Sequence, residues 1–492
     1  MSRVLRPHQS RIVERLRESL ATGHRRPMVQ APTGAGKTVV AGAIVRGALA
    51  KGKRVLFVVP ALSLIDQTVR SFWAEGIRDV GVIQGAHPMT DASKPVQVAS
   101  IQTLQRRAIP RFDIVVIDEA HRWFEMLGLW MGSPDWATVP FVGLSATPWT
   151  RGLGKFYDDL ISVTTTASLI EGGYLSPFRV YVPSHPDLTG VRTVAGDYHE
   201  GDLGEAMNKP ALVADVVQTW LQRGENRPTF IFGVDRAHAK NLQAQFEAAG
   251  VPTGYIDAYT KADEREVLFR RFTSGELTAI ASVGCLTTGV DLDVRCIVLA
   301  RPTKSEMLFV QIIGRGLRTA PGKDDLLVLD HSDTHLRLGF VTDIHHDVLD
   351  DGRERQKREA KAKPEAMPKE CPSCSFLKPL KAPKCPACGF KPERQSEVQC
   401  DDGDLVEMTP KRARASTIEK ESLFGQLKHV ARRRNYSEGW AAHKFRELTG
   451  VWPDRYHNAP LVEPTAFVLS WIKSRQIAYI KTRGRSHAHA AE

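Results

Sequence analysis

Two short segments about eighty residues apart constrain this chain more than any other feature. The first, Ala31-Pro-Thr-Gly-Ala-Gly-Lys-Thr38, sets closely spaced glycines before a lysine and a threonine. The second, Asp118-Glu-Ala-His121, ends the apolar run 114–117. Backbone N–H groups of a glycine-rich loop can wrap phosphates, and a carboxylate at a strand end can hold a metal ion. Together the two segments predict a site that binds and hydrolyses a nucleoside triphosphate.

The residue chemistry suggests a role for each side chain of this site. Lys37 would bind the β and γ phosphate oxygens of ATP, and Thr38 and Asp118 would hold Mg²⁺. Glu119 would act as the base that accepts a proton from the attacking water. The other loop residues expected to contact the nucleotide are Thr33, Gly34, Ala35 and Gly36.

Length and charge bound the number of domains and the class of partner. At 492 residues the chain is too long for one core, and about 150 residues per domain indicates about three units. Residues 411–492 hold 16 Lys and Arg against 7 Asp and Glu, a balance of +9 that leaves only +2 of the total +11 for the rest. A basic tail favours a polyanionic partner, nucleic acid above all, with solvated surface charge as the alternative.

Membrane and secretion signals are not evident in the sequence. No stretch approaches the roughly 18 apolar residues of a membrane span, and the first residues lack the apolar core of a secretory signal. Four of the seven cysteines fall in one tight cluster, as expected for a metal site rather than for disulfides. We therefore expect a cytoplasmic protein without membrane contact.

The first 175 residues alternate helix-like stretches with short β-branched runs, a pattern typical of a parallel sheet covered by helices. An amphipathic helix is expected over 11–20, ahead of the phosphate loop. Another is expected over 38–49, where its N-terminal dipole would face the phosphates. The expected strands are 55–59, 96–100, 114–117 and 141–144.

A second alternation of the same kind covers residues 205–350 and has no phosphate loop of its own. Its expected strands are 229–233, 279–282, 296–299 and 326–329, and its expected helices are 236–249 and 262–274. The fold class is thus α/β, with two tandem parallel-sheet domains followed by a small zinc ribbon and a small helical domain. The predicted boundaries are 1–175, a linker at 176–204, 205–350, a charged connector at 351–370, the ribbon at 371–392, a linker at 393–415, a basic helical domain at 416–480 and a tail at 481–492.

Several further segments, in the right order, resemble the motifs of superfamily 2 helicases and translocases of the DEAD/DEAH type. The resemblance covers residues 1–335. Besides the two segments above, it rests on Leu5-Arg-Pro-His-Gln9, 59–67, 99–104, Leu144-Ser-Ala-Thr-Pro148, Thr287-Thr-Gly-Val-Asp291 and Gln311-Ile-Ile-Gly-Arg-Gly-Leu-Arg318.

This resemblance implies two RecA-like domains that share one ATP. Gln9 would hydrogen-bond the adenine edge, with Arg6 stacked on its face. From the second domain, Arg315 and Arg318 would stabilise the charge that develops on the γ-phosphate. The remaining residues that the resemblance adds to the site are Gln311, Gly289 and Asp291.

Plainer explanations exist for some of these residues. Gln9 could be an ordinary surface residue, and Ser145 and Thr147 could simply cap or bridge a strand end. Asp291 could be a turn residue. For Lys37, Asp118, Glu119 and Arg318, each of which fits a motif whose context is satisfied, such explanations carry little weight.

The cysteine cluster consists of two Cys-x-x-Cys knuckles. Two-residue gaps let both sulfurs of a knuckle reach one ion, so the pattern predicts a structural four-thiolate Zn²⁺ site. A redox pair, disulfides and an iron–sulfur cluster are the alternatives. Lysines between the knuckles (Lys378, Lys381 and Lys384) would give the ribbon a basic face, or else a solvated loop. The predicted zinc ligands are Cys371, Cys374, Cys385 and Cys388.

The last unit interleaves basic and aromatic residues, which suits nucleic-acid binding, although in so small a helical unit the aromatics more often form the core. Its cations at 432–434 are the expected DNA contacts. A helicase core, a four-cysteine ribbon and a small basic domain resemble the RadD-type branch of bacterial and phage DNA-repair helicases. That implies single-stranded or branched DNA, and repair or recombination proteins, as partners. An ATP-switched DNA adaptor without unwinding and an RNA-directed helicase are the alternatives.

Overall fold

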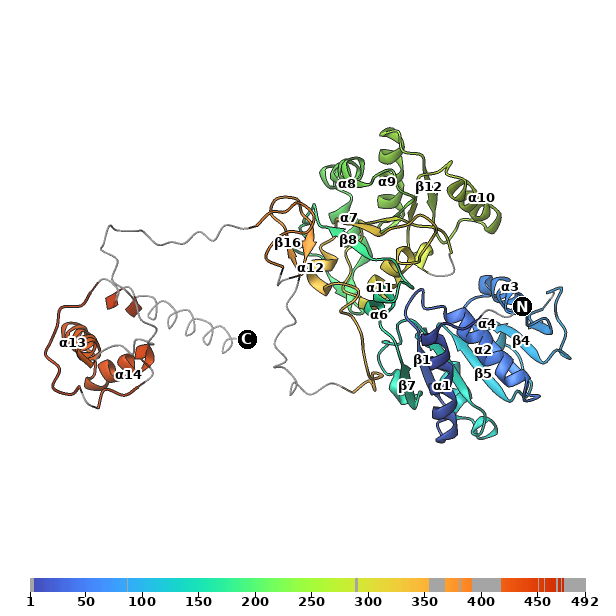
Figure 1. Cartoon of the computed structure of the whole chain (residues 1–492), viewed down its shortest axis with the longest axis horizontal. Coiled ribbons are helices and arrows are strands. Elements are labelled where there is room, and N and C mark those ends of the chain that lie inside the picture. The colour runs from blue at the N-terminus through green and yellow to red at the C-terminus, as the bar shows by residue number, and fades with distance from the viewer. Residues whose placement is uncertain are drawn as a thin grey trace. The chain divides into compact units, whose positions relative to one another are not determined.

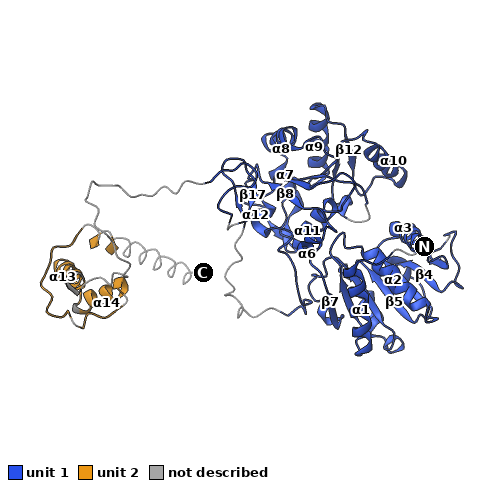
Figure 2. Cartoon of the chain, in the orientation of Figure 1, with its two compact units in different colours: residues 1–394 blue, residues 395–492 orange. Residues whose placement is uncertain are grey.

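The computed structural model describes two compact units, residues 1–394 and 395–492 (Figure 2). Within the described ranges, none of the helices has the length and apolar character that a membrane span requires. The described ranges are 4–85, 87–287, 291–353, 368–379, 382–391, 417–449, 451–454, 456–465, 468–469 and 471–472.

The first unit begins with a seven-stranded sheet, part of which Figure 1 labels. Every pair of neighbouring strands is parallel, and the order is β3-β4-β2-β5-β6-β1-β7. Its central strands are buried along their length, as expected for a sheet covered on both faces. The strands are β1 Pro27–Gln30, β2 Val55–Val59, β3 Val80–Ile83, β4 Val96–Ser100, β5 Ile114–Asp118, β6 Phe141–Ser145 and β7 Asp159–Ser162. The helices are α1 Pro7–Ala21, α2 Lys37–Leu49, α3 Ile65–Ala74, α4 Ile101–Leu104, α5 Glu125–Gly132 and α6 Thr166–Glu171. We call this part the first domain.

A second parallel sheet follows, with six strands in the order β12-β13-β11-β14-β15-β8. We call this part the second domain. Its strands are β8 Phe178–Tyr181, β11 Thr229–Phe232, β12 Thr253–Ile256, β13 Ala279–Ser282, β14 Cys296–Leu299 and β15 Leu326–Asp330. Its helices are α7 Glu200–Met207, α8 Pro210–Arg223, α9 Arg236–Ala248, α10 Ala262–Thr273, α11 Glu306–Gly316 and α12 Thr334–Leu338. Two tandem parallel-sheet domains, as the sequence predicts, are therefore present.

The segment 176–204, which we expected to be a linker, contains regular structure. Phe178–Tyr181 forms β8, which pairs in parallel with β15 at the edge of the second sheet. A short antiparallel hairpin follows, β9 Thr193–Val194 and β10 Asp197–Tyr198. The many Pro, Gly and His residues around these short strands are typical of loops, so the composition of the segment does not predict the strands.

The cysteine segment packs onto this edge of the second sheet. Its hairpin strands are β16 Lys369–Glu370 and β17 Leu377–Lys378. Phe376 forms a bridge with Tyr181 of β8, their rings lie 5.4 Å apart, and the Val182 N–H donates to the Ser375 carbonyl at 2.9 Å. Leu377 is buried in the core of the second domain. The ribbon segment therefore continues the second domain.

The second unit is helical in its described part, with α13 Thr417–Arg433 and α14 Glu438–Thr449. One face of α13 is buried, because Phe424, Leu427, Val430 and Ala431 are all buried and Leu423 is partly buried beside them. They pack with residues of α14 and of the segment that follows it, namely Ala441, Phe445, Ala459, Val468 and Ile472.

Candidate functional site

The glycine-rich loop joins the buried strand β1 to the N-terminus of α2. Gly34 and Gly36 have φ of +88° and +86°, a left-handed conformation that favours glycine. Gly36 is the residue from which α2 begins. The loop therefore presents backbone N–H groups and a helix N-terminus to one point, the geometry that binds phosphate.

Lys37, the first residue of α2, reaches the two acidic residues at the end of β5. Its Nζ lies 2.9 Å from Asp118 Oδ1 and also bonds Glu119 Oε1. Burial would lower the pKa of Lys37, but the two carboxylates outweigh it and hold that pKa above its usual value. Burial has the largest effect on Asp118 and raises its pKa above the usual value, although the charge of Lys37 acts in the opposite direction.

Glu119 is held in an unusual backbone conformation. Its φ is +48°, which a non-glycine residue rarely adopts, and its N–H donates to Asp118 Oδ1 at 2.9 Å. Burial favours its neutral form, but the charge and the hydrogen bond of Lys37 overcome this and keep the pKa of Glu119 below its usual value. An ionised carboxylate is thus aimed into the site by a strained turn.

A hydrogen-bond chain links the first domain to α11 of the second. His121 Nδ1 lies 2.9 Å from Ser145 Oγ, and Ser145 Oγ also accepts the Thr147 N–H at 3.0 Å. The Gln311 amide donates to Thr147 Oγ1 at 3.1 Å and lies 3.3 Å from His121 Nε2. Burial lowers the pKa of His121 to about 4, so Nε2 of its neutral ring can accept from Gln311.

Two arginines of the same segment approach the phosphate loop. Arg315 is buried, and its guanidinium donates to the Thr287 carbonyl at 2.9 Å. Burial, with a contribution from the Arg318 charge, lowers the pKa of Arg315 to about 10, so it stays charged at neutral pH. Arg318 Nη1 lies 2.5 Å from Asp291 Oδ1.

One cavity of about 560 Å³ brings these residues together. It is bounded by both domains, so Lys37 and the two arginines face the same space. The sequence-predicted residues that line it are Arg6, Gln9, Thr33, Gly34, Gly36, Lys37, Thr38, Asp118, Glu119, Asp291, Gln311, Arg315 and Arg318. Ala35 is fully buried and is not in this lining, and Gly289 lies outside the described residues.

Gln9 is buried, so it is not an ordinary surface residue. Its Oε1 accepts the Arg6 N–H at 2.9 Å, and its Nε2 donates to the Ala35 carbonyl at 2.9 Å. Sequence reasoning missed Tyr174, whose ring lies 5.1 Å from the Arg6 guanidinium and 4.9 Å from the His8 ring. A single aromatic with no spacing pattern gives no signal in the sequence.

The two domains touch closely beside the loop. Gly314, two residues before the end of α11, faces Thr33, and an added Cβ would lie only 2.5 Å from the Thr33 Cβ. The Gly34 position is equally tight against the Leu175 side chain. Glycine at 314 therefore permits the close approach of the arginine-bearing helix to the phosphate loop.

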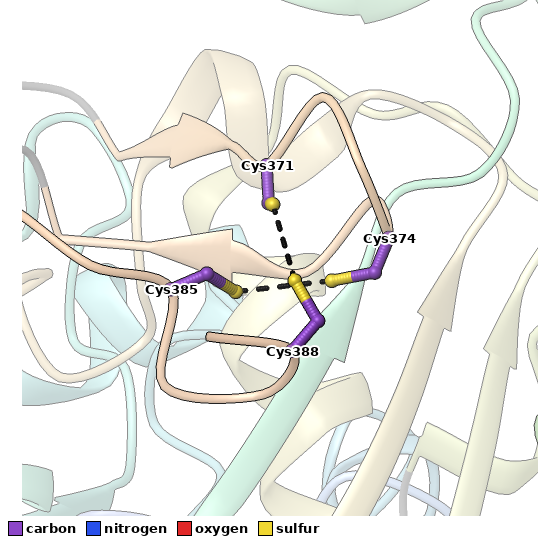
Figure 3. A group of neighbouring side chains, drawn as sticks. All are labelled: Cys371, Cys374, Cys385 and Cys388. Carbon is purple, nitrogen blue, oxygen red and sulfur yellow. Dashed lines mark hydrogen bonds between the residues drawn. The ribbon is translucent and has the colours of Figure 1, made fainter. Parts of the chain in front are cut away.

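The four cysteines of the ribbon converge, as Figure 3 shows. Cys371 and Cys388 sulfurs are 3.7 Å apart, those of Cys374 and Cys385 are 3.8 Å apart, and all four lie within 4.8 Å of one another. Sulfurs at about 2.3 Å from a tetrahedral Zn²⁺ would be about 3.8 Å apart, whereas a disulfide needs about 2.0 Å. The donor set and its spacing therefore fit a four-thiolate metal site.

Both knuckles use the same turn. The Cys371 and Cys385 carbonyls accept from the N–H of the residue four positions later, Ser375 and Gly389, at 2.9 Å in each case. Those two residues have φ of +57° and +76°. A residue in the left-handed conformation therefore completes each turn, Gly389 in the second knuckle and Ser375 in the first.

The predicted basic face of the ribbon is wrong for Lys378. This side chain is buried, and its Nζ donates to the Ala382 carbonyl at 3.1 Å. Lys384 is exposed, and Lys381 lies outside the described residues. Lys378 is therefore bound to the backbone between the knuckles and is not part of an exposed basic face.

In the second unit, most aromatics are structural while the arginines are exposed. Arg432, Arg433 and Arg434 all face solvent at the end of α13. Trp452 is 41% exposed, and the Arg446 guanidinium lies 4.5 Å from its ring. The aromatics that belong to the hydrophobic cluster or pack against it are Phe424, Phe445, Tyr436, Trp440, Tyr456 and Trp471.

Comparison with known proteins matches both sheet domains. Residues 2–149 match the family described as "Type III restriction enzyme, res subunit", and residues 209–320 match "Helicase conserved C-terminal domain". A "51.5 kDa protein" of a Lactococcus phage is 27% identical over 82% of this chain and 86% of its own length.

Two named relatives extend the comparison. The "Putative ATP-dependent helicase IRC3" of Saccharomyces cerevisiae is 29% identical over 66% of this chain, which spans about half, 51%, of the yeast protein. The "ATP-dependent DNA helicase uvsW" of phage T4 is 22% identical over 63% of this chain and 66% of its own length. The two family matches, residues 2–149 and 209–320, include Lys37, Glu119 and the two arginines of the cavity.

Proposed function

Because the chain belongs to the ATP-hydrolysing helicases of superfamily 2, we propose that it is a DNA translocase or helicase that acts in DNA repair or recombination. One observation carries this proposal. The cavity that contains Lys37 and Glu119 of the first domain is also lined by Arg315 and Arg318 of the second. A triphosphate in that cavity would meet groups from both domains, so its hydrolysis would depend on their relative position.

The proposed chemistry follows from these side chains. The phosphate oxygens of ATP would take the place of the carboxylates around Lys37. Glu119, freed from the lysine, would orient the attacking water and accept its proton. Arg315 and Arg318 would meet the charge that develops on the γ-phosphate.

Magnesium would be held by Thr38 and Asp118. A hydroxyl and a carboxylate are the hard oxygen ligands that Mg²⁺ prefers, and both side chains line the cavity next to the loop. When bound, the ion supplies charge neutralisation on the phosphate oxygens. Zinc would be held by Cys371, Cys374, Cys385 and Cys388 in a closed structural site.

Coupling to movement would run through α11. Gln311 bonds Thr147 and approaches His121, which follows the catalytic carboxylates in the chain. A change at the γ-phosphate that shifts Glu119 would therefore also change the contacts of Gln311. Repeated opening and closing of the cleft could then move the protein along a strand.

DNA is the proposed substrate for two reasons. The T4 relative is by its name a DNA helicase, and residues 411–492 have a net charge of +9. Exposed cations at 432–434 suit a phosphate backbone. The order of core, four-cysteine ribbon and basic unit further supports a RadD-like assignment and a role on single-stranded or branched DNA.

The test compares ATP hydrolysis by the purified chain with no polymer, with single-stranded DNA and with single-stranded RNA. We expect DNA to stimulate hydrolysis, and we expect Glu119→Gln to abolish it while leaving the fold intact. Stimulation by RNA alone would replace the DNA assignment. Stimulated hydrolysis without unwinding of a forked duplex or displacement of a bound roadblock would instead favour an ATP-switched adaptor.

A further inference from the structure

Residues 339–353 leave the second domain after α12 and return to the first domain (Figure 1). We call this segment the strap. Its beginning is fixed in the second domain, where Val341 is 1% exposed and the Phe340 ring lies 5.9 Å from Phe178 of β8. The strap is thus a connection between the domains in addition to the chain segment that joins β7 to β8.

The far end of the strap is bound to a turn of the first domain. The Asp350 carbonyl accepts the Gly154 N–H at 2.7 Å, and Asp350 Oδ1 accepts the Gly152 N–H at 3.0 Å. Leu349 packs against a hydrophobic cluster of the first domain that includes Leu153. A Cβ at Gly154 would lie 3.1 Å from the Asp350 carbonyl oxygen, so the contact is close.

The middle of the strap touches both domains at once. His346 Nε2 lies 2.8 Å from Oε2 of Glu306, the first residue of α11, and its ring lies 4.7 Å from the Trp149 ring. Trp149 follows Thr147 by two residues, and Thr147 bonds Gln311 of the same helix. The helix α11 is therefore held against one loop of the first domain at two points, about 7.5 Å apart along its axis.

We propose that the strap positions α11, and with it Arg315 and Arg318, over the phosphate loop. His346 and Asp350 are its positioning residues. Because α11 is packed into the second domain, that domain can pivot against the first when it is held through Gln311 alone. A second hold through His346 and an anchor at Asp350 fix its direction. The strap then favours the closed cleft, so losing it lowers the fraction of binding-competent molecules and weakens apparent ATP affinity. This inference rests on the proposed ATP hydrolysis for its kinetic test only.

The kinetic test uses the full chain with saturating single-stranded DNA. Asp350→Ala removes the carboxylate bond of the anchor, and Asp347→Ala is its control, an exposed aspartate of the same strap. We expect KM for ATP to rise about fivefold in Asp350→Ala and in His346→Ala, with kcat changed by less than about twofold. His346→Gln, whose amide can still donate to Glu306, should recover most of the loss.

A second measurement does not need catalysis. Fluorescent labels on non-natural amino acids at exposed Lys51 and Ala248 report the distance between the domains. We expect a longer or broader distance distribution in Asp350→Ala than in the wild type or Asp347→Ala. If the wild type hydrolyses no ATP, the proposed function fails but this comparison still decides the strap. An unchanged distribution in Asp350→Ala overturns the strap proposal, whatever the hydrolysis rates.

Discussion

The Gln311 side chain donates a hydrogen bond to the Thr147 hydroxyl at 3.1 Å, across the boundary between the two domains. Thr147 belongs to the loop after β6, and Gln311 to the middle of α11. A polar contact between separate domains at the cavity wall ties the arrangement of one domain to that of the other.

The first prediction removes this contact. Gln311→Ala loses the bond to Thr147 and the approach to His121, so we expect ATP turnover with DNA to fall about thirtyfold, as for two hydrogen bonds of about 1 kcal/mol each. Steady-state hydrolysis checks this. Gln245→Ala, an exposed glutamine of α9, should behave as the wild type. Undiminished turnover in Gln311→Ala would show that the contact has no part in catalysis.

The second prediction concerns Arg318. Arg318→Ala should lower turnover by about 10³, the lower range for arginines supplied to a phosphoryl-transfer site from another domain. Arg318→Lys should not restore it, because an ammonium lacks the planar fork of donors. Single-turnover hydrolysis is the measurement, and Arg270→Ala, an exposed arginine of α10, is the control. Full recovery of turnover in Arg318→Lys would show that Arg318 acts only through its positive charge.

The third prediction is one zinc ion per chain. Phe376 and Leu377 pack against the second domain, so removing the metal should lower the unfolding temperature of that domain as well as release the ribbon. Metal analysis after anaerobic purification and calorimetry with a chelator test this. Cys374→Ser should mimic the chelator, while Cys285→Ser, outside the cluster, should retain the zinc. Less than one zinc per chain would contradict the assignment.

The fourth prediction concerns the exposed arginines of the second unit. Replacing Arg432, Arg433 and Arg434 with alanine should weaken single-stranded DNA binding and reduce its salt slope by up to about 2. Fluorescence anisotropy at several salt concentrations measures both. Replacing Arg11, Arg15 and Arg17, exposed on α1, removes the same charge elsewhere and is the control. An unaltered salt slope would show that DNA contacts another surface of the protein.

The fifth prediction is a pH dependence of stability. Burial lowers the pKa of His238 to about 4, below its usual 6.5. Between these values the unfolded chain binds more protons, so the stability that comes from the neutral ring is present above pH 6.5 and is lost as pH falls toward 4. Denaturant unfolding between pH 7 and 4.5 should show this loss, on the order of 2 kcal/mol, and His238→Gln should reduce it. Parallel curves for both proteins would contradict the prediction.

The sequence predicts those parts of the fold whose pattern is local. The strand 55–59 and the helix after the phosphate loop agree with β2 and α2 to within a residue, because apolar runs and glycine-bounded helices are read from neighbouring residues. The strand β8 is not predicted from the sequence, because it is short and its partner β15 lies about 150 residues away. Long-range pairing leaves no local pattern.

The functional site likewise contains residues that the sequence predicts and residues that it does not. Lys37, Asp118 and Glu119 are recognisable from spacing, and the structure brings them within bonding distance. The contribution of Tyr174 and the burial of Lys378 depend on tertiary contacts that no motif encodes. The roles of Gly289 remain a prediction, because it lies outside the described residues.

The bridge between Phe376 and Tyr181 has a further consequence for how the protein behaves at high concentration. Without the ribbon, β8 would be a bare edge with open N–H and C=O groups, a template on which a second molecule could add its own strand. The cysteine segment covers that edge. Molecules that lack this segment are therefore expected to self-associate. Light scattering would detect the self-association even where ATP hydrolysis is unchanged.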